Sequence, residues 1–101
     1  MSLKKQYLKG ESKCKVIFSL SRDSAGSART AHIVGDFNKW ERSANPMKRL
    51  KDGSFTATIT LPKNNEYQFR YLLDSDRWEN DSNADKYVTN EHGSENSVVV
   101  V

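Results

Sequence analysis

The sequence predicts an all-β protein in which two β-sheets pack as a sandwich. Apolar and polar residues alternate with a period of two in several segments, which is typical of strands with one buried face. Clusters of Gly, Pro, Asn, Asp and Ser separate these segments at short intervals. No segment keeps the period of an amphipathic helix, and the chain contains no internal repeat, so a sandwich of short strands is the expected architecture.

The length and composition indicate one folded domain with a polar extension at its start. A chain of 101 residues is the usual size of a single domain, and a second domain would be too small to bury its own core. Hydrophobic residues make up 36% of the chain and include patterned aromatic residues, unlike a disordered chain. Residues 1–12 are polar and lysine-rich, so we expect an N-terminal arm followed by a folded domain over residues 13–101.

The first predicted strand is Lys13–Leu20, in which every second side chain is apolar. Ser21–Arg29 is rich in Ser, Gly and Asp and is predicted to be a loop. Thr30–Val34 follows as a short strand, and the chain then turns between Gly35 and Trp40. The expected buried face of the first strand consists of Cys14, Val16, Phe18 and Leu20.

A β-hairpin is predicted in the middle of the chain. Met47–Leu50 is a short strand, and Asp52 followed by Gly53 is a strong signal for a tight turn between two strands. Phe55–Leu61 has the clearest alternation in the chain, with threonine at every second position. Because β-branched threonine suits the exposed face of a strand, this segment is predicted to be half-buried.

Further strands are predicted towards the C-terminus. Glu66–Leu73 carries aromatic residues on one face and polar residues on most of the other. A turn after Asp74 leads to a short returning strand, Arg77–Glu79. The segment at Tyr87 rejoins a sheet, and Ser97–Val101 closes the fold.

Charge, cysteine content and hydropathy predict a cytoplasmic protein that binds neither nucleic acid nor membrane. The formal net charge is +3, but lysines gather near the N-terminus and acidic residues in the last third, whereas a nucleic-acid-binding domain needs a basic face across the fold. The single cysteine, Cys14, excludes an intramolecular disulfide, as expected for a reducing compartment. No apolar segment approaches the roughly 18 residues of a membrane span, and no signal-peptide pattern is present.

Two tryptophans, Trp40 and Trp78, stand in polar surroundings beside predicted turns, so they are candidates for an exposed binding surface as well as for the core. A flat indole can cover the apolar face of a sugar ring, and burial of about 100 Å² would stabilise such a complex by about 2.5 kcal/mol. The sugar hydroxyls would then need polar partners. Side chains of the right kind are those of Gln68, Arg70, Ser94 and Asn96. A peptide or a nucleotide would also suit an aromatic pair.

The segment from Val34 to Trp40 is V-G-D-F-N-K-W, which resembles the G-x-F-N-x-W signature of family 48 carbohydrate-binding modules. That family includes the glycogen-binding domain of the AMP-activated kinase β subunit and the early-set domains of isoamylases and glycogen branching enzymes. The similarity covers roughly residues 13 to 101. Further motifs in the same order are Leu50–Phe55, Leu61 with Pro62, Tyr67–Tyr71, Asp74, Trp78, Val88–Asn90, Gly93 and Asn96.

The resemblance implies an immunoglobulin-like β-sandwich that binds α-1,4-linked glucose chains such as glycogen, starch and maltodextrins without cleaving them. Two tryptophans hold the sugar in the kinase-type module, and their positions match Trp40 and Trp78. The expected ligand is therefore an α-glucan polysaccharide or oligosaccharide.

The resemblance also implies roles for residues around the two tryptophans. Arg70 stands where the kinase-type module has a lysine, and it keeps the charge but presents a planar group. Ser94 and Asn96 match a hydroxyl residue and an asparagine of the last loop. His92 replaces a leucine that reaches through the sugar chain, and an imidazole would stack or form hydrogen bonds instead.

A protein-interaction module is the second hypothesis. Early-set domains often pack on a catalytic domain, so this chain would dock on a separate glycogen-metabolising enzyme or self-associate through strand edges, with weak or no sugar binding. The observation that favours it is the altered last loop, especially His92.

An enzymatic function is the weakest hypothesis. Hydrolysis of a glycoside needs two carboxyl groups at a fixed separation across a cleft, and turn residues in solvent do not provide this. We therefore expect no catalytic residue in the acidic cluster of Asp74, Asp76, Glu79 and Asp81. Cys14, His32 and His92 lack the spacing of metal ligands, so no metal site and no cofactor are predicted.

Overall fold

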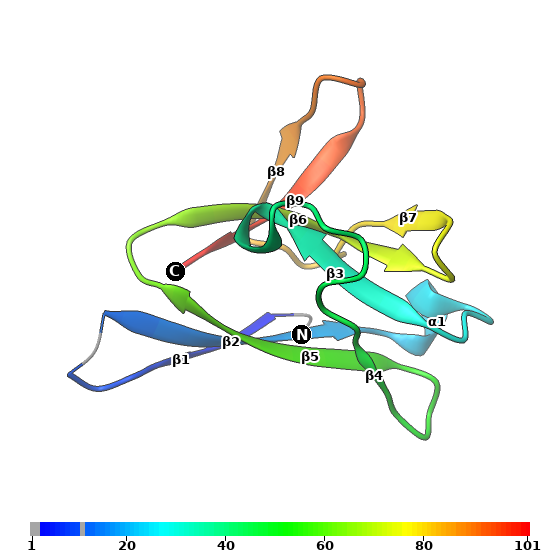
Figure 1. Ribbon diagram of the computed structural model, residues 1–101, viewed down its shortest axis with the longest axis horizontal. Coiled ribbons are helices and arrows are strands. Elements are labelled where there is room, and N and C mark those ends of the chain that lie inside the picture. Colours follow the sequence, from blue (N-terminus) through cyan, green and yellow to red (C-terminus); the bar gives the residue numbers. More distant parts are fainter. Residues whose placement is uncertain (1–2, 11) are drawn as a thin grey trace.

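A computed structural model describes residues 3–10 and 12–101 of the chain. Two antiparallel β-sheets pack against each other, and the chain crosses repeatedly from one sheet to the other (Figure 1). The prediction of an all-β sandwich is therefore confirmed.

The first sheet has the strand order β1-β2-β5-β4. Strand β2 pairs with β5 along its whole length, with Val16 opposite Ile59 and Phe18 opposite Ala57. Paired residues share a face, so these apolar side chains all point toward the other sheet. The strands are β1 (Leu3–Tyr7), β2 (Lys13–Leu20), β4 (Lys48–Arg49) and β5 (Phe55–Pro62).

The second sheet has the strand order β3-β6-β9-β8, and the short strand β7 also pairs with β6. Strand β3 lies along one edge of β6, and β9 and β7 follow one another along the opposite edge. Strand β6 is thus the centre of this sheet. The strands are β3 (Ala31–Gly35), β6 (Glu66–Leu73), β7 (Arg77–Glu79), β8 (Lys86–Thr89) and β9 (Glu95–Val100).

Aromatic side chains fill the space between the sheets. The ring centroids of Phe18 and Phe69 lie 5.1 Å apart, and those of Phe69 and Tyr71 lie 5.6 Å apart, both in edge-to-face geometry. All three residues are fully buried, and such contacts add to the stability that burial provides. Cys14 is buried beside them as a free thiol, as the alternation in its strand predicts.

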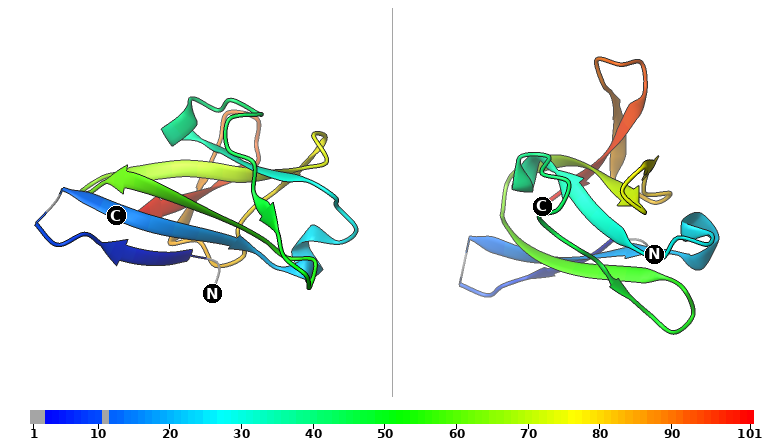
Figure 2. Two further views of the ribbon diagram at one scale, coloured as in Figure 1. Left: turned by 60° about the horizontal axis from the view of Figure 1, so that its bottom comes forward. Right: turned by 45° about the vertical axis from the view of Figure 1, so that its right-hand side comes forward.

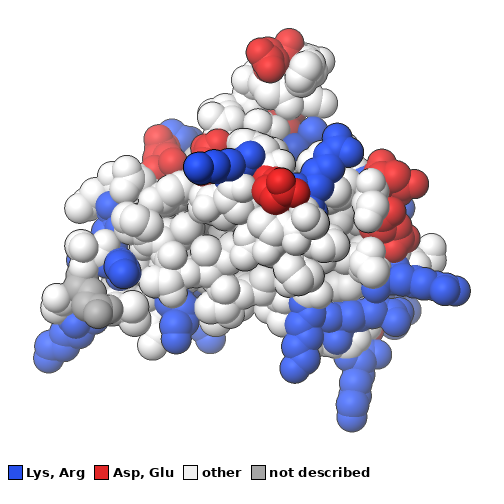
Figure 3. Space-filling view, in the orientation of Figure 1, with Lys and Arg blue, Asp and Glu red and all other residues white. Residues whose placement is uncertain are grey.

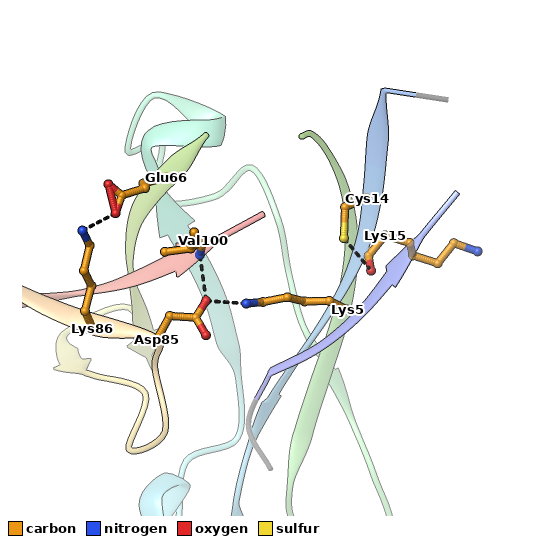
Figure 4. A network of polar contacts seen from close by, with 7 residues as sticks. All are labelled: Lys5, Cys14, Lys15, Glu66, Asp85, Lys86 and Val100. Carbon is orange, nitrogen blue, oxygen red and sulfur yellow. Dashed lines mark hydrogen bonds and ion pairs between the residues drawn. The ribbon is translucent and has the colours of Figure 1, made fainter. Parts of the chain in front are cut away.

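The expected polar arm contains a strand. Leu3–Tyr7 forms β1 at the edge of the first sheet, and Leu3 is buried in the core. The Lys5 Nζ donates a hydrogen bond to Asp85 Oδ2 at 2.6 Å, and the backbone N–H of Val100 donates to the same oxygen at 2.7 Å (Figure 4). Residues that the sequence assigns to an arm therefore tie the first sheet to the second.

Two short helices interrupt the strands. The single-turn helix α1 (Arg22–Ala25) lies in the predicted loop after β2, and the Ser21 hydroxyl caps it by accepting the Ser24 N–H at 3.2 Å. The 3₁₀ turn η1 (Asp36–Asn38) follows β3. Within the described residues, neither helix has the length or the apolar character needed to cross a bilayer.

The second sheet buries a small apolar layer on its outer face as well. Val34, Leu72 and Val98 are at most 2% exposed, although strand alternation points them away from the core. Segments that pack on this face must therefore cover them. The residues paired with them are Arg70 opposite Val34, Trp78 opposite Leu72 and Gln68 opposite Val98.

The hairpin formed by β8 and β9 extends beyond the two packed sheets, as Figure 1 and the right-hand view of Figure 2 show. An ion pair between Lys86 and Glu66 joins its base to β6 (Figure 4). In the space-filling view, Lys and Arg side chains gather along the lower edge, whereas acidic side chains mark the projecting hairpin (Figure 3). The tip of the hairpin is thus held above the outer face of the second sheet.

Candidate functional site

An open hollow of about 490 Å³ lies on the outer face of the second sheet. Strand β6 contributes its floor, and the turn after β3, strand β7 and the β8–β9 hairpin contribute its walls. The lining residues are Trp40, Arg42, Gln68, Arg70, Trp78, Asn90, Glu91, His92 and Asn96. Six of the seven site residues predicted from the sequence are thus brought together, and Ser94 is outside the lining.

The turn after β3 is anchored by two side chains with different partners. Phe37 points into the core, where its ring centroid lies 5.8 Å from that of Phe18. The Asn38 Oδ1 accepts the backbone N–H of Gly35 at 3.0 Å, and its Nδ2 donates to a carbonyl oxygen of β3 at 2.9 Å. One apolar anchor and one polar anchor therefore fix the backbone that carries Trp40.

Gly35 allows this turn to lie directly against β6. A Cβ atom at position 35 would lie only 2.4 Å from the carbonyl oxygen of Gln68 and 2.7 Å from Phe69 Cβ. Two left-handed residues then reverse the chain, with φ of 57° at Lys39 and 59° at Trp40. Left-handed backbone costs a non-glycine residue roughly 1–2 kcal/mol, and such strain persists where the surroundings fix it.

Asp36 holds the Trp40 indole in place. The indole N–H donates to Asp36 Oδ1 at 2.9 Å, and the backbone N–H of Gln68 donates to Asp36 Oδ2 at 2.8 Å. One carboxylate thereby links the tryptophan to strand β6. Because its N–H is already used, Trp40 offers a ligand the face of its ring and not a hydrogen-bond donor.

Trp78 reaches the hollow from β7. Its backbone lies opposite Leu72, so its side chain is on the outer face of the second sheet. The connection from β6 contains Asp74 and Ser75 with φ of 50° and 64°, as in a type I′ turn, whose twist matches that of paired strands. This turn sets the position of Trp78 over β6.

Two guanidinium groups lie over the Trp78 ring. The Cζ atom of Arg42 is 5.5 Å from the ring centroid, and that of Arg70 is 5.8 Å from it. Both are cation–π contacts, which typically contribute about 0.5–1 kcal/mol at exposed sites. Within the described residues, the Nε of Arg70 is buried and has no hydrogen-bond partner.

Three side-chain amides in the lining of the hollow are joined by hydrogen bonds. The Asn90 Nδ2 donates to Asn96 Oδ1 at 3.2 Å, and the Asn96 Nδ2 donates to Gln68 Oε1 at 3.0 Å. Asn96 is only 8% exposed, so it orients the other two amides. The Gln68 Nε2 has no partner among the described residues and remains able to donate to a ligand hydroxyl.

The tip of the β8–β9 hairpin carries His92 and Glu91 as an exposed pair. The His92 Nε2 lies 3.7 Å from Glu91 Oε1, and their side chains are 82% and 87% exposed. The Asn90 Oδ1 shapes this loop by accepting the backbone N–H groups of His92 at 2.9 Å and of Ser94 at 3.1 Å. Ser94 thus takes part in the loop through its backbone.

The comparison with known protein families covers most of the chain. Residues 9–101 match a family model described as the glycogen recognition site of AMP-activated protein kinase. The chain belongs to this family. The matched range of this glycogen-recognition domain contains strands β2 to β9 and every residue that lines the hollow, whereas β1 lies before it. No curated protein matches the chain.

Two of the four clustered acidic residues of this glycogen-recognition domain accept hydrogen bonds away from the hollow. The buried Asp81 accepts a hydrogen bond from the Tyr71 hydroxyl at 2.6 Å. The Asp74 Oδ1 accepts the backbone N–H groups of Arg29 at 2.9 Å and Thr30 at 3.0 Å. The bond from Thr30 is the main reason why the pKa of Asp74 lies below its ordinary value of 3.8.

Four site residues of this glycogen-recognition domain were not among the sequence predictions. Asp36 stands four positions before Trp40, and only the fold shows that its carboxylate meets the indole N–H. Arg42 follows Trp40 in the same turn, which was the available signal for it. Asn90 and Glu91 directly precede His92 in the sequence, and this position beside a predicted site residue was the available signal for them.

Proposed function

We propose that the protein is a non-catalytic module that binds α-1,4-linked glucan chains, glycogen among them, in the hollow between Trp40 and Trp78. The observation that carries this proposal is that indoles from two separate elements line one open hollow together with hydrogen-bonded side-chain amides. Membership of the glycogen-recognition family supports the same ligand class.

The chemistry of the lining fits a sugar chain. The Trp40 indole offers an apolar face to the C–H face of a glucose ring and is fixed in advance by its bond to Asp36, and the Trp78 indole lines the same hollow. The Gln68 amide and the Arg70 guanidinium supply donors for hydroxyl groups along the ring edge. The small apolar layer of the same face lies beside these two side chains and is buried.

The acids that line the hollow support binding without cleavage. The lining contains one carboxyl group, that of Glu91, and its side chain is 87% exposed. Glycoside hydrolysis generally uses two carboxyl groups, one of them with a raised pKa. This pattern supports a binding role and gives no pair for acid–base catalysis.

Mobility in native gels with and without glycogen, together with calorimetric titration of maltoheptaose, tests the proposal. The wild-type protein is expected to be retarded by glycogen. Trp40→Ala removes about 100 Å² of apolar contact, or about 2.5 kcal/mol, so affinity should fall by one to two orders of magnitude. Trp78→Ala should weaken binding in the same direction.

Tyr7→Ala is the matched control, because Tyr7 is an aromatic residue of β1 that is 54% exposed and lies outside the hollow. This variant should bind as the wild type does. If glycogen retards Trp40→Ala and the wild type equally, and both melt at the same temperature, the proposal is wrong.

A protein-interaction module is the second candidate function. Within the described residues, β1 and β8 each pair on one side only, and each carries an exposed tyrosine, Tyr7 or Tyr87. Open edges of this kind can add a strand from another chain, such as that of a glycogen-metabolising enzyme. Light scattering of the purified protein and pull-down from amylase-treated lysate test this candidate. A monomer that retains no enzyme would count against it.

A further inference from the structure

Two arginines from different elements converge at one end of the hollow. Arg42 comes from the turn after β3 and Arg70 from the centre of β6, and both guanidinium groups lie within 6 Å of the Trp78 ring centroid. A cation–π contact holds a guanidinium over a ring but leaves most of its five N–H donors unused. The planar donor set of arginine matches the oxygens of a phosphate group.

Neither guanidinium is neutralised by the protein. Within residues 3–10 and 12–101, the ion pairs involve Lys5, Lys86 and His92, and neither guanidinium group donates a hydrogen bond. The buried Nε of Arg70 is therefore a desolvated donor that lacks an acceptor. Such a group favours a ligand that brings an acceptor to it.

The two ends of the hollow differ in charge. At the Trp40 end, the Asp36 carboxylate accepts the indole N–H and the backbone N–H of Gln68. At the Trp78 end, two guanidinium groups lie within 6 Å of the ring centroid, whereas the Glu91 carboxylate of the lining is exposed and lies beside His92. An anionic substituent is thus repelled at one end and attracted at the other, which orients a ligand that carries one.

We propose that the hollow prefers an α-glucan that carries a phosphate monoester, and that Arg42 and Arg70 bind the phosphate beside Trp78. This inference rests on the proposed function, because the sugar itself is held by the tryptophans. A neutral glucan would remove water from two guanidinium groups and offer them only hydroxyl groups as acceptors. A phosphate monoester brings a charge of about −1.5 to −2 and three acceptor oxygens. The discriminating residue is Arg42, which is exposed and belongs to the same turn as Trp40.

Calorimetric titration with maltoheptaose and with singly phosphorylated maltoheptaose tests the inference. The phosphorylated ligand should bind about tenfold tighter at low ionic strength, and the preference should shrink as salt is added. In Arg42→Gln the ratio of the two affinities should fall to about one. Arg49→Gln removes the same charge from an exposed position on β4 of the other sheet, so it should keep the preference of the wild type.

The outcomes separate this inference from the proposed function. Equal affinity of the wild type for both oligosaccharides would overturn the inference and leave glucan binding intact. Binding of neither oligosaccharide would overturn the proposed function itself. Equal loss of preference in Arg49→Gln, or competition by inorganic phosphate as strong as that of the phosphorylated oligosaccharide, would also overturn the inference. A thermal melt of each variant establishes that it is folded.

Discussion

At the scale of single residues, the lack of a Cβ atom at Gly35 allows strand β3 to lie close to β6. In Gly35→Ala the new Cβ would lie 2.4 Å from the Gln68 carbonyl oxygen, so the two strands must separate. Overpacking of this kind costs about 1–3 kcal/mol. We expect a lower unfolding midpoint in urea and weaker glycogen binding, because both Gln68 and Trp40 move with the strands.

Gly10→Ala is an informative control for this variant. Gly10 has a φ of +75°, and alanine substitution there would bring the new Cβ within 4 Å of no other described residue, its chain neighbours aside, so it strains the backbone without such a clash. The expected cost is about 1–2 kcal/mol, with no effect on glycogen binding. Unchanged binding and stability in Gly35→Ala would contradict the role given to the close approach.

The residue types predicted which side chains line the hollow better than they predicted the contacts among those side chains. Trp40 and Trp78 stand in polar sequence beside turns, and polar residues such as Gln68 alternate with the core residues of β6, so their shared face follows from strand geometry. The contacts of Asp36 and Arg42 depend on left-handed backbone in the turn after β3. Local sequence does not specify such backbone at lysine and tryptophan, which rarely adopt it.

At the scale of elements, the turn between β6 and β7 is joined to the segment before β3 by one carboxylate. Backbone N–H groups of Thr30 and Arg29 lower the pKa of Asp74 below 3.8. The charged form is therefore favoured in the folded state, and this contribution to stability is present above about pH 3.8 and is lost as the pH falls through the folded pKa.

Asp74→Asn tests this link, because asparagine tolerates the left-handed backbone of the turn but carries no charge. The melting temperature should fall at neutral pH, and its decline below pH 4 should be shallower than in the wild type. Asp76→Asn, in the same turn, should melt as the wild type does. A parallel acid profile for Asp74→Asn and the wild type would contradict the prediction.

Strand positions were predictable where one face is apolar and the other polar. The predicted bounds of Lys13–Leu20, Glu66–Leu73 and Arg77–Glu79 agree with β2, β6 and β7. Strand β1 was missed because this edge strand is mostly exposed, so its side chains show no clear alternation. Its link to the second sheet, from Lys5 to Asp85, joins residues far apart in sequence.

At the scale of the whole molecule, the hydrogen bond between Tyr71 and Asp81 makes the fold sensitive to alkali. Burial, and then the charge of the Asp81 carboxylate, raise the pKa of Tyr71 well above 10.0. The unfolded chain therefore loses this proton first, so the contribution of Tyr71 is complete below about pH 10 and declines as the pH rises further.

Urea unfolding followed by circular dichroism between pH 8 and pH 11 measures this effect. Tyr71→Phe should cost about 1–3 kcal/mol at pH 8, because the buried Asp81 loses a donor, and should unfold with a weaker dependence on pH above 10. Tyr7→Phe, at an exposed position, should keep the wild-type dependence. Identical slopes for Tyr71→Phe and the wild type above pH 10 would contradict the prediction.

The placement of both tryptophans in the hollow has an optical consequence. The chain has two indoles, and the core between the sheets is built from phenylalanine, tyrosine and aliphatic residues. Indole emission from the folded protein therefore originates at the face that carries the hollow, and the core between the sheets contributes none. A thermal melt followed by indole fluorescence would report the loosening of the hollow, whereas one followed by backbone circular dichroism would report the loss of the strands. A difference between the two midpoint temperatures would show that this face opens before the molecule unfolds.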